Sequence, residues 1–275
     1  MLISKIRQNP IIYSICFVLL VIIIHQIPLY RIFENLGLQS IIANLLDKIL
    51  LNLVVIIIAL KEIKKKKLFE FSGLSLKKIK NRYLYLILVF YLFIFTGGFS
   101  TIRLLTQDDL LTFVVLTFLI KSISVGFLEE IVFRSLIQGS FMNKKKYGVY
   151  MSVFISALIF AFAHIINIQY DYISISSVAS QIFAAFCLGS LFGAILIRTK
   201  NIYPIILIHS AISFFSLLGT LFPEYFPDEV KLDKSTPEII ASIIFSIVLF
   251  GSAFLIAYFI LKNPNKNDKT TAINL

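Results

Sequence analysis

The sequence contains few cysteines, few charged residues and no tryptophan. Two of its 275 residues are cysteine, and Asp, Glu, Lys and Arg together make up 15%. Cys16 and Cys187 both lie inside apolar runs, so neither a disulfide framework nor a CxxC metal or redox motif is expected. With 58% hydrophobic residues and a mean hydropathy of +0.90, the chain is too apolar for a soluble enzyme.

Eight apolar segments of about the length that crosses a bilayer fill most of the chain. A spanning helix needs about 20 mostly apolar residues. The segments predicted to span are 10–30, 41–60, 83–99, 110–128, 148–168, 178–197, 202–222 and 237–261. The pattern predicts an all-α fold, a polytopic membrane helix bundle with about eight transmembrane helices. Residues 1–262 are expected to form a single transmembrane domain, and residues 263–275 a disordered cytoplasmic tail.

The basic residues indicate how the chain is oriented in the membrane. Lys and Arg number 26 against 15 Asp and Glu, a net charge of +11. If the amino terminus is cytoplasmic, most of these basic residues fall in the inside segments, as the positive-inside rule requires. Both termini are therefore predicted to be cytoplasmic. The bilayer is an expected partner, and no nucleic-acid binding is expected. The lysine run 64–67 is interpreted as a topology marker, with attraction to anionic lipid as the alternative.

Ionisable residues at membrane depth are costly and are functional candidates by default. The densest group is Glu129-Glu130-Ile131-Val132-Phe133-Arg134, in a helix expected to continue to about Phe141. Glu130 and Arg134 are four residues apart, the spacing at which a carboxylate and a guanidinium meet on one helix face. Glu129 points about 100° away from Glu130. We expect a structural Glu130–Arg134 clamp and a Glu129 that is free to act, with a solvated helix end as the alternative.

Two histidines are expected at comparable depth. His164 follows Phe160 by one helical turn and precedes Asn167 by three residues, so Phe160 and Asn167 are expected to support it. His209 is followed four residues later by Ser213, whose hydroxyl is expected beside the imidazole. A single histidine in a helix is more often a hydrogen-bonded core residue than a catalyst. Three polar groups at similar depth, however, can converge in one pocket that is reachable from the cytoplasmic side.

A carboxylate and two imidazoles in a dry pocket are suited to activating water. Glu129, hydrogen-bonded to a histidine, can take a proton from water that attacks a carbonyl and return it to the leaving amine. A second histidine with a neighbouring hydroxyl can stabilise the oxyanion. Glu129, His164 and His209 also have the His₂Glu composition of catalytic zinc sites. Because the sequence has no HExxH motif, no metal or other cofactor is expected, and zinc bound by these three residues is the alternative.

The other polar and small residues of the apolar segments are given structural interpretations. His25 is expected to be an interfacial anchor, and Asp47 and Lys48 are expected to neutralise each other. Lys121 either lines the cavity of the candidate site or pairs within the bundle. The sixth apolar segment repeats small residues every four positions, which predicts close helix packing; they are Ala185, Gly189 and Gly193.

Three motifs, in order on successive apolar segments, resemble the CPBP family of intramembrane proteases. They are Glu-Glu-x-x-x-Arg at Glu129, Glu130 and Arg134, Phe-x-x-x-His at Phe160 and His164, and a third histidine motif at His209. The family, also called Abi, includes the type II CAAX prenyl endopeptidases and bacterial proteins linked to bacteriocin self-immunity. The resemblance covers about residues 121–215, which is the expected core of the domain.

The resemblance implies a role for each of these residues. Glu129 and His164 would activate the water, while His209 and the residue at position 213 would form the oxyanion site. Glu130 and Arg134 would be supporting residues. The chain departs from the family at Ser213, where an asparagine or aspartate is usual. A serine hydroxyl donates one hydrogen bond but reaches less far, so oxyanion stabilisation is expected to be weaker or supplied differently.

The function implied by the resemblance is an endopeptidase that hydrolyses a peptide bond of a membrane-associated peptide or protein. The composition, rich in Ile and Lys, is typical of an AT-rich bacterial genome, so a bacterial cytoplasmic membrane is the expected location and prenylated substrates are not. Bacteriocin self-immunity or peptide maturation is the expected setting. One alternative is a non-catalytic immunity or regulatory protein that binds a bacteriocin or a membrane partner. A small transporter is less favoured, because the sequence shows no inverted repeat.

Overall fold

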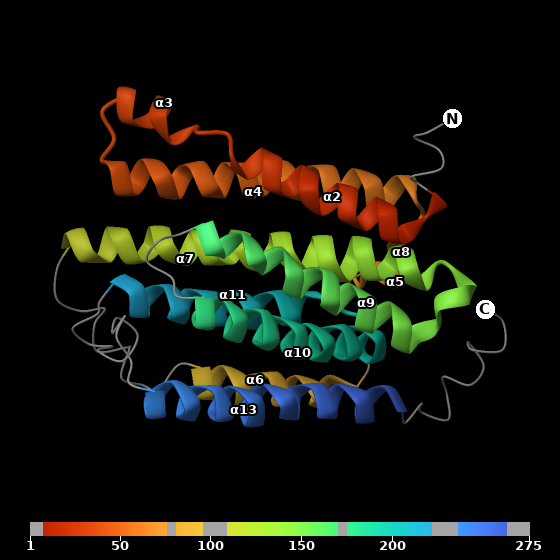
Figure 1. Cartoon of the computed structure of the whole chain (residues 1–275). Coiled ribbons are helices and arrows are strands. Elements are labelled where there is room, and N and C mark those ends of the chain that lie inside the picture. The colour runs from red at the N-terminus through yellow and green to blue at the C-terminus, as the bar shows by residue number, and fades with distance from the viewer. Residues whose placement is uncertain (1–7, 76–80, 96–108, 170–174, 222–235, 263–275) are drawn as a thin grey trace.

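The computed structural model describes residues 8–75, 81–95, 109–169, 175–221 and 236–262, and every regular element among them is a helix (Figure 1). The elements, in chain order, are α2 (Pro10–His25), α3 (Tyr30–Asn35), α4 (Ser40–Lys65), α5 (Phe69–Ser72), η1 (Arg82–Leu84), α6 (Tyr85–Phe95), α7 (Asp109–Glu129), η3 (Glu130–Gln138), α8 (Gly139–Met142), η4 (Lys145–Tyr147), α9 (Gly148–Ala163), η5 (His164–Gln169), α10 (Ile175–Thr199), α11 (Tyr203–Leu221) and α13 (Thr236–Lys262). The predicted all-α class is confirmed for this part of the chain.

Each of the eight predicted segments coincides with a helix, but not every helix meets the length and apolarity of a membrane span. Within the described ranges, five stretches do: Pro10–Asn35, Ser40–Lys65, Lys145–Gln169, Ile175–Thr199 and Ile243–Lys262. Two further apolar stretches are shorter, Arg82–Leu92 and Tyr203–Phe215. The chain is therefore a multi-pass membrane protein, and the count of eight spans stays a prediction.

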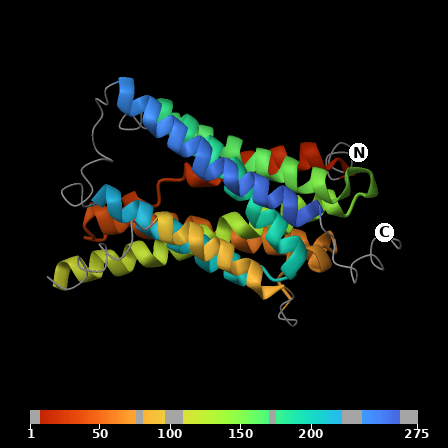
Figure 2. The same ribbon diagram turned by 90° about the horizontal axis from the view of Figure 1, so that it is seen from below.

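The long helices stack in layers (Figure 1), and the view from below shows that they lie at an angle to one another (Figure 2). Near the centre, α7 packs against α4 on one side and α11 on the other, while α10 packs against α9 and α13. The pair α6 and α13 forms the lower layer of Figure 1 and faces the viewer in Figure 2. The chain passes back and forth, so α11 runs antiparallel to α7 (Figure 1). This arrangement brings the residues of α7, η3, α9, α10 and α11 together in the middle of the bundle.

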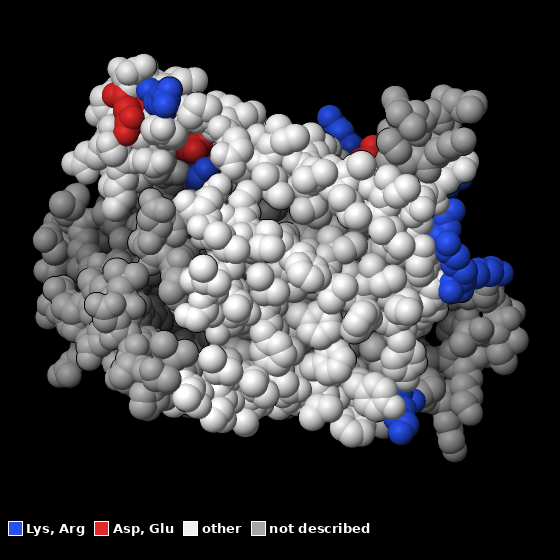
Figure 3. Space-filling model, in the orientation of Figure 1, with Lys and Arg blue, Asp and Glu red and all other residues white. Residues whose placement is uncertain are grey.

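Charge separates the two ends of the bundle from its middle. On the face shown in Figure 3, Lys and Arg gather at one end, a few residues of both signs lie near the other, and the band between them is uncharged. The exposed Lys144, Lys145 and Lys146 lie at the basic end. Helix α2 begins and α13 ends at this same end (Figure 1). The orientation of this end toward the cytoplasm stays a prediction.

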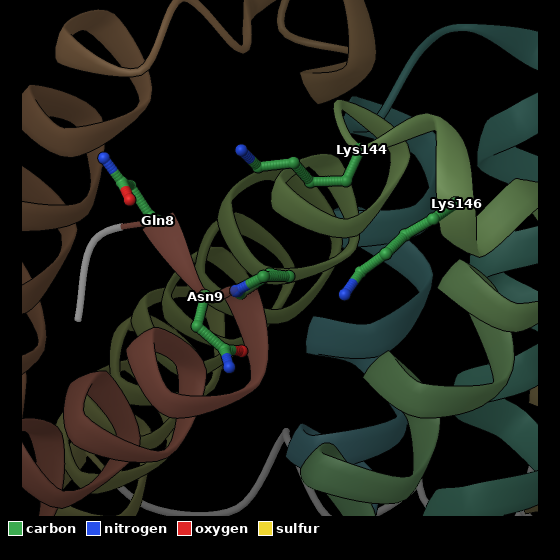
Figure 4. Close-up of a pocket in the computed structure, with 5 residues that line it drawn as sticks. Gln8, Asn9, Lys144 and Lys146 are labelled. Carbon is green, nitrogen blue, oxygen red and sulfur yellow. The ribbon is translucent and has the colours of Figure 1, made fainter. Parts of the chain in front are cut away.

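A hollow of about 350 Å³ opens at the basic end, between the start of α2 and the turn after α8 (Figure 4). Its lining residues are Gln8, Asn9, Pro10, Lys144 and Lys146. The Asn9 side chain accepts hydrogen bonds from the backbone amides of Ile11 and Ile12, and so caps α2. None of the predicted site residues lines this hollow.

Local sequence explains where several helices begin and end. The predicted segment 10–30 breaks after His25, because Pro28 follows within a turn and helices usually end before a proline. Gly73 has a φ of +68°, which suits a glycine that ends a helix. Its carbonyl accepts a 3.0 Å hydrogen bond from the Ile202 amide. This bond fixes the start of α11, the helix that carries His209.

Buried apolar side chains form two clusters. The first joins α2, α4, η3 and α9, and includes Val55, Leu136 and Phe160. The second joins α6, α10, α11 and α13, and includes Leu88 and Phe192. The candidate site lies where the two clusters meet, since both contribute an aromatic ring to it.

Candidate functional site

The imidazole of His209 is held between two consecutive carboxylates. Its Nδ1 lies 2.7 Å from Oε1 of Glu130, and its Nε2 lies 3.1 Å from Oε2 of Glu129. The Glu130 side chain is fully buried, while that of Glu129 is 20% exposed. The site therefore contains one inaccessible carboxylate and one that is partly exposed.

The charges of this group balance. Ionised carboxylate oxygens only accept hydrogen bonds, so an imidazole that bonds to two of them donates from both nitrogens and is an imidazolium. The two carboxylates of Glu129 and Glu130 are then matched by His209 and by the guanidinium of Arg134. Because an unbalanced charge at membrane depth is costly, this neutral quartet is the arrangement that burial favours.

Arg134 lies on η3, a π-helix that continues α7 directly. Its Nε is 3.4 Å from Oε2 of Glu130, so the predicted clamp at the i and i+4 positions is present. The guanidinium carbon also lies 4.8 Å from the centre of the Phe160 ring, a cation–π contact. Glu130 also contacts His209 and so connects the clamp to the rest of the site, which no sequence pattern indicated. π-Helical turns occur frequently at functional sites.

Phe160 links the two histidines. Its ring is edge-on to His164 at 4.9 Å and to His209 at 6.1 Å, measured between ring centres. Phe192 of α10 contacts His209 from the other cluster at 5.4 Å. These aromatic rings exclude solvent from the imidazole of His209, which is 9% exposed.

His164 begins the 3₁₀-helix η5, at the point where α9 ends. Its Nδ1 lies 3.0 Å from the Phe160 carbonyl oxygen, which can only accept, so Nδ1 carries a proton. In the neutral imidazole, Nε2 is then a hydrogen-bond acceptor. His164 also lies within electrostatic range of Glu129. The structure thus brings Glu129, His164 and His209 into one neighbourhood, as expected.

Two other expected site residues have different surroundings. Asn167 donates a 2.8 Å hydrogen bond to Gln181 of α10 and not to His164. Ser213 is half-buried, and in the described part of the chain its hydroxyl makes no hydrogen bond to His209. Among the described residues, the hydroxyl expected beside the imidazole therefore makes no hydrogen bond to it, and its role at the oxyanion stays a prediction.

A close approach of α7 and α11 sets the position of His209 relative to the two glutamates. A Cβ added to Gly126 would lie 3.0 Å from the Ser210 amide nitrogen and 3.0 Å from the Ile206 carbonyl oxygen. A side chain at Gly126 would push the helices apart. No sequence pattern predicted this contact. The only signals for it in the sequence were Gly126, which lies between Ser124 and Glu129 on α7, and Ser210, which follows His209.

The other ionisable residues singled out from the sequence lie elsewhere, on α2, α4 and the part of α7 before the glutamates. Asp47 and Lys48 pair at 3.6 Å, as expected. The Lys48 ammonium also donates to the His25 carbonyl at 3.2 Å. The Lys121 ammonium lies 5.6 Å from the Phe118 ring centre, and no ion pair joins it to a described carboxylate. In the described part of the chain, no contact of Lys121 therefore supports either of its predicted roles.

The His₂Glu set does not fit a metal ion in this arrangement. Both ring nitrogens of His209 face carboxylates, which leaves neither lone pair for a metal. In the described ranges, no three His, Cys, Asp or Glu side chains are grouped so that they could hold a metal. No metal-dependent step is derived for this site.

Comparison with known proteins gives one match. A family model described as type II CAAX prenyl endopeptidase Rce1-like matches residues 109–215. No curated protein and no solved structure matches the chain. The family model is that of a protease family and supports protease activity. Residues 109–215, which contain the whole candidate site, are therefore similar to the type II CAAX prenyl endopeptidases of the CPBP family, as the sequence motifs predicted.

Proposed function

We propose that the chain is an intramembrane endopeptidase in which Glu129 activates the hydrolytic water and His209 stabilises the oxyanion. The observation that supports this most is the position of His209, between a fully buried Glu130 and a partly exposed Glu129. An imidazolium fixed in this way places a preorganised positive charge beside the negative charge that develops in the transition state. The family match over the same residues supports protein substrates.

In the proposed reaction, Glu129 takes a proton from water as the water oxygen attacks the substrate carbonyl carbon. The carbonyl π electrons move to its oxygen. Once Glu129 is protonated, it no longer holds the Nε2–H of His209, which then donates a hydrogen bond to this oxyanion. When the tetrahedral intermediate collapses, the carbon–nitrogen bond breaks, and Glu129 returns the proton to the leaving amine. Glu130 and Arg134 position His209 and balance its charge.

His164 has a separate role in this proposal. Because its Nδ1 donates to the Phe160 carbonyl, its Nε2 is available to accept a hydrogen bond from the attacking water. Water held by both His164 and Glu129 is oriented before it reacts, which removes part of the entropic cost of the reaction. Ser213 contributes to oxyanion binding only after it moves closer to His209.

The proposed substrate is a membrane-associated peptide or protein, and the proposed location is the cytoplasmic membrane of a bacterium. Bacteriocin self-immunity or peptide maturation is the proposed setting. We propose a glutamate-type mechanism without a metal, because both ring nitrogens of His209 bond to carboxylates. Proteolysis by the purified protein should therefore continue after incubation with a zinc chelator such as 1,10-phenanthroline, and complete loss that added zinc restores would contradict the proposal.

The function is tested by comparing the protein N-termini of membranes from cells that express the wild type or Glu129→Gln at equal levels. New termini seen only with the wild type are expected, and they would identify the substrate. Glu62→Gln is the matched control, because it makes the same change in α4, where Glu62 accepts a 3.1 Å hydrogen bond from Tyr13. If all three profiles match while deletion of the protein still produces a phenotype, the chain is a binding or regulatory protein and not a protease.

A further inference from the structure

A row of buried polar atoms without hydrogen-bond partners follows the candidate site along η3. Within the described part of the chain, Arg134 lacks a partner for Nε, Nη1 and Nη2, and Gln138 lacks one for Oε1. Arg134 is fully buried, and Gln138 is 1% exposed. Apart from the ion pair with Glu130, the guanidinium therefore has several unused donors. Buried polar groups in native proteins are almost always hydrogen-bonded, so such a row calls for a ligand.

The unused donors and the unused acceptor face the same stretch of α10. A Cβ added to Gly189 would lie 3.0 Å from Nη2 of Arg134. One helical turn later, a Cβ on Gly193 would collide with Oε1 of Gln138. The Gln138 amide nitrogen already donates to the Gly193 carbonyl at 3.3 Å. Gly189 thus leaves room for the guanidinium of Arg134, which has unused donors. Gly193 leaves room for the amide of Gln138, whose Oε1 is an unused acceptor.

Charge selects the kind of ligand. The two carboxylates are already balanced by Arg134 and the His209 imidazolium, so an added anion or cation would leave a net charge in the bundle. A neutral molecule that accepts from Arg134 and donates to Gln138 satisfies both side chains. Water does this, and buried water makes about three hydrogen bonds to groups that would otherwise be unsatisfied.

We propose that ordered water bridges Arg134 and Gln138, and that this water supplies the hydrolytic reaction. The supply role rests on the proposed protease function. The row extends from Glu130 at the site to Ser140 on α8, whose 5% exposed hydroxyl also lacks a described partner. Helix α8 lies toward the basic end of the bundle, so the row extends from the site in the direction of that end (Figure 1). A hydrolase inside a bilayer needs such a path, because lipid supplies no water.

X-ray radiolytic labelling tests the water directly, since hydroxyl radicals formed from bound water oxidise the nearest side chains. Phe160 lies against Arg134 and is 3% exposed, while Phe17 of α2 is similarly buried at 5%. In the full-length protein, Phe160 is expected to be oxidised several times faster than Phe17. Gln138→Met removes the acceptor at nearly constant volume and should reduce Phe160 oxidation to the Phe17 rate. Equal rates in the wild type, or a Phe160 rate that Gln138→Met leaves unchanged, would overturn the bridging water.

Turnover tests the supply role. Gln138→Met should lower kcat about tenfold at unchanged KM, the loss expected for one hydrogen bond to a charged group. Gln39→Met, at the exposed start of α4, is the matched control and should not change kcat. Gly193→Ala, which presses on Gln138, should reproduce the effects of Gln138→Met on labelling and kcat. Loss of labelling with normal kcat would overturn the supply role. Labelling requires no activity, so failure of the protease function is distinguished from failure of the water site.

Discussion

This bundle holds two polar clusters, each centred on a histidine, which differ in how their polar atoms are satisfied. The His209 cluster is Glu129, Glu130, Arg134 and His209. The His25 cluster is His25, Asn52 and Ser124. In the first, an imidazole lies between two carboxylates, and a fully buried guanidinium makes no hydrogen bond to the described residues. In the second, amide and hydroxyl groups close a chain of hydrogen bonds.

The chain in the His25 cluster joins three helices. His25 bonds to the Val21 carbonyl at 2.8 Å through Nδ1, and to the Asn52 side-chain amide at 2.8 Å through Nε2. Asn52 donates to the Ser124 hydroxyl at 2.9 Å, and Ser124 donates to the Lys121 carbonyl at 2.7 Å. This chain uses its polar groups to hold α2, α4 and α7 together.

A histidine held among polar groups therefore does not by itself identify a functional site. Satisfied networks rigidify a core, whereas unsatisfied or shared groups are where function is expected. The His209 cluster has a carboxylate that remains partly exposed, unused donors on Arg134 and a family match, while the His25 cluster lies outside the matched segment except for Ser124. Substitutions in the two clusters test this difference.

The two histidines should respond very differently to the same substitution. His209→Gln removes the cationic donor to the oxyanion and should lower kcat about 10²–10³-fold, the typical effect of losing one such donor. His25→Gln should leave kcat within about twofold, because it changes only a structural hydrogen bond. Peptide cleavage by the two purified variants, each checked for a monodisperse gel-filtration profile, measures the contrast. Equal losses in both variants would remove the distinction between the clusters.

Removing Arg134 should destabilise the fold. Arg134→Met leaves the carboxylates of Glu129 and the buried Glu130 with only His209 to balance them, which should lower the free energy of unfolding by about 3–5 kcal/mol. The double variant Glu130→Gln with Arg134→Met removes both charges and should recover much of that loss. Thermal unfolding in detergent measures these differences. A double variant no more stable than Arg134→Met would show that the charge of Glu130 is not the cause.

Breaking the His25 cluster should affect stability alone. Asn52→Leu leaves His25 and Ser124 without their shared partner and should lower the free energy of unfolding by about 1–3 kcal/mol. The kcat of the folded protein should not change, since Asn52 is not part of the His209 cluster. A kcat that falls in parallel with stability would show that the two clusters are coupled through α7.

Ser213→Asn should give the smallest effect and the opposite direction. The longer side chain can reach the oxyanion position that Ser213 does not contact, so kcat should rise, by less than about tenfold for one added hydrogen bond. Ser210→Asn is not a suitable control, because Ser210 packs closely against Gly126. Ser40→Asn, at the exposed start of α4, is the better one. An unchanged kcat for Ser213→Asn would place the oxyanion away from position 213.

Hydropathy and spacing predicted the helices and the order of the motifs, because both depend on local sequence. All eight apolar segments coincide with helices, and the Glu130–Arg134 pair follows from its spacing alone. The contact of Glu130 with His209 depends instead on how α7 and α11 approach each other. That approach depends on Gly126 and on packing between distant residues, which no local pattern specifies.

The surroundings of His164 show a second limit of local reasoning. The sequence predicted one continuous ridge carrying Phe160, His164 and Asn167, as in a regular α-helix. Helix α9 instead ends at Ala163 and continues as a 3₁₀-helix, and the Asn167 amide bonds to Gln181. The sequence likewise predicted a continuous α-helix through residues 130–138, where the structure has the π-helix η3.

In the proposed mechanism, Glu129 activates water for peptide hydrolysis inside the membrane. The most direct measurement is cleavage of a substrate peptide, identified from the new membrane N-termini, by purified protein in liposomes. The wild type and Asn52→Leu should cleave it at equal rates, whereas Glu129→Gln should be slower by about 10²–10⁴-fold, the usual contribution of a general base. Cleavage by Glu129→Gln at the wild-type rate would contradict the claim.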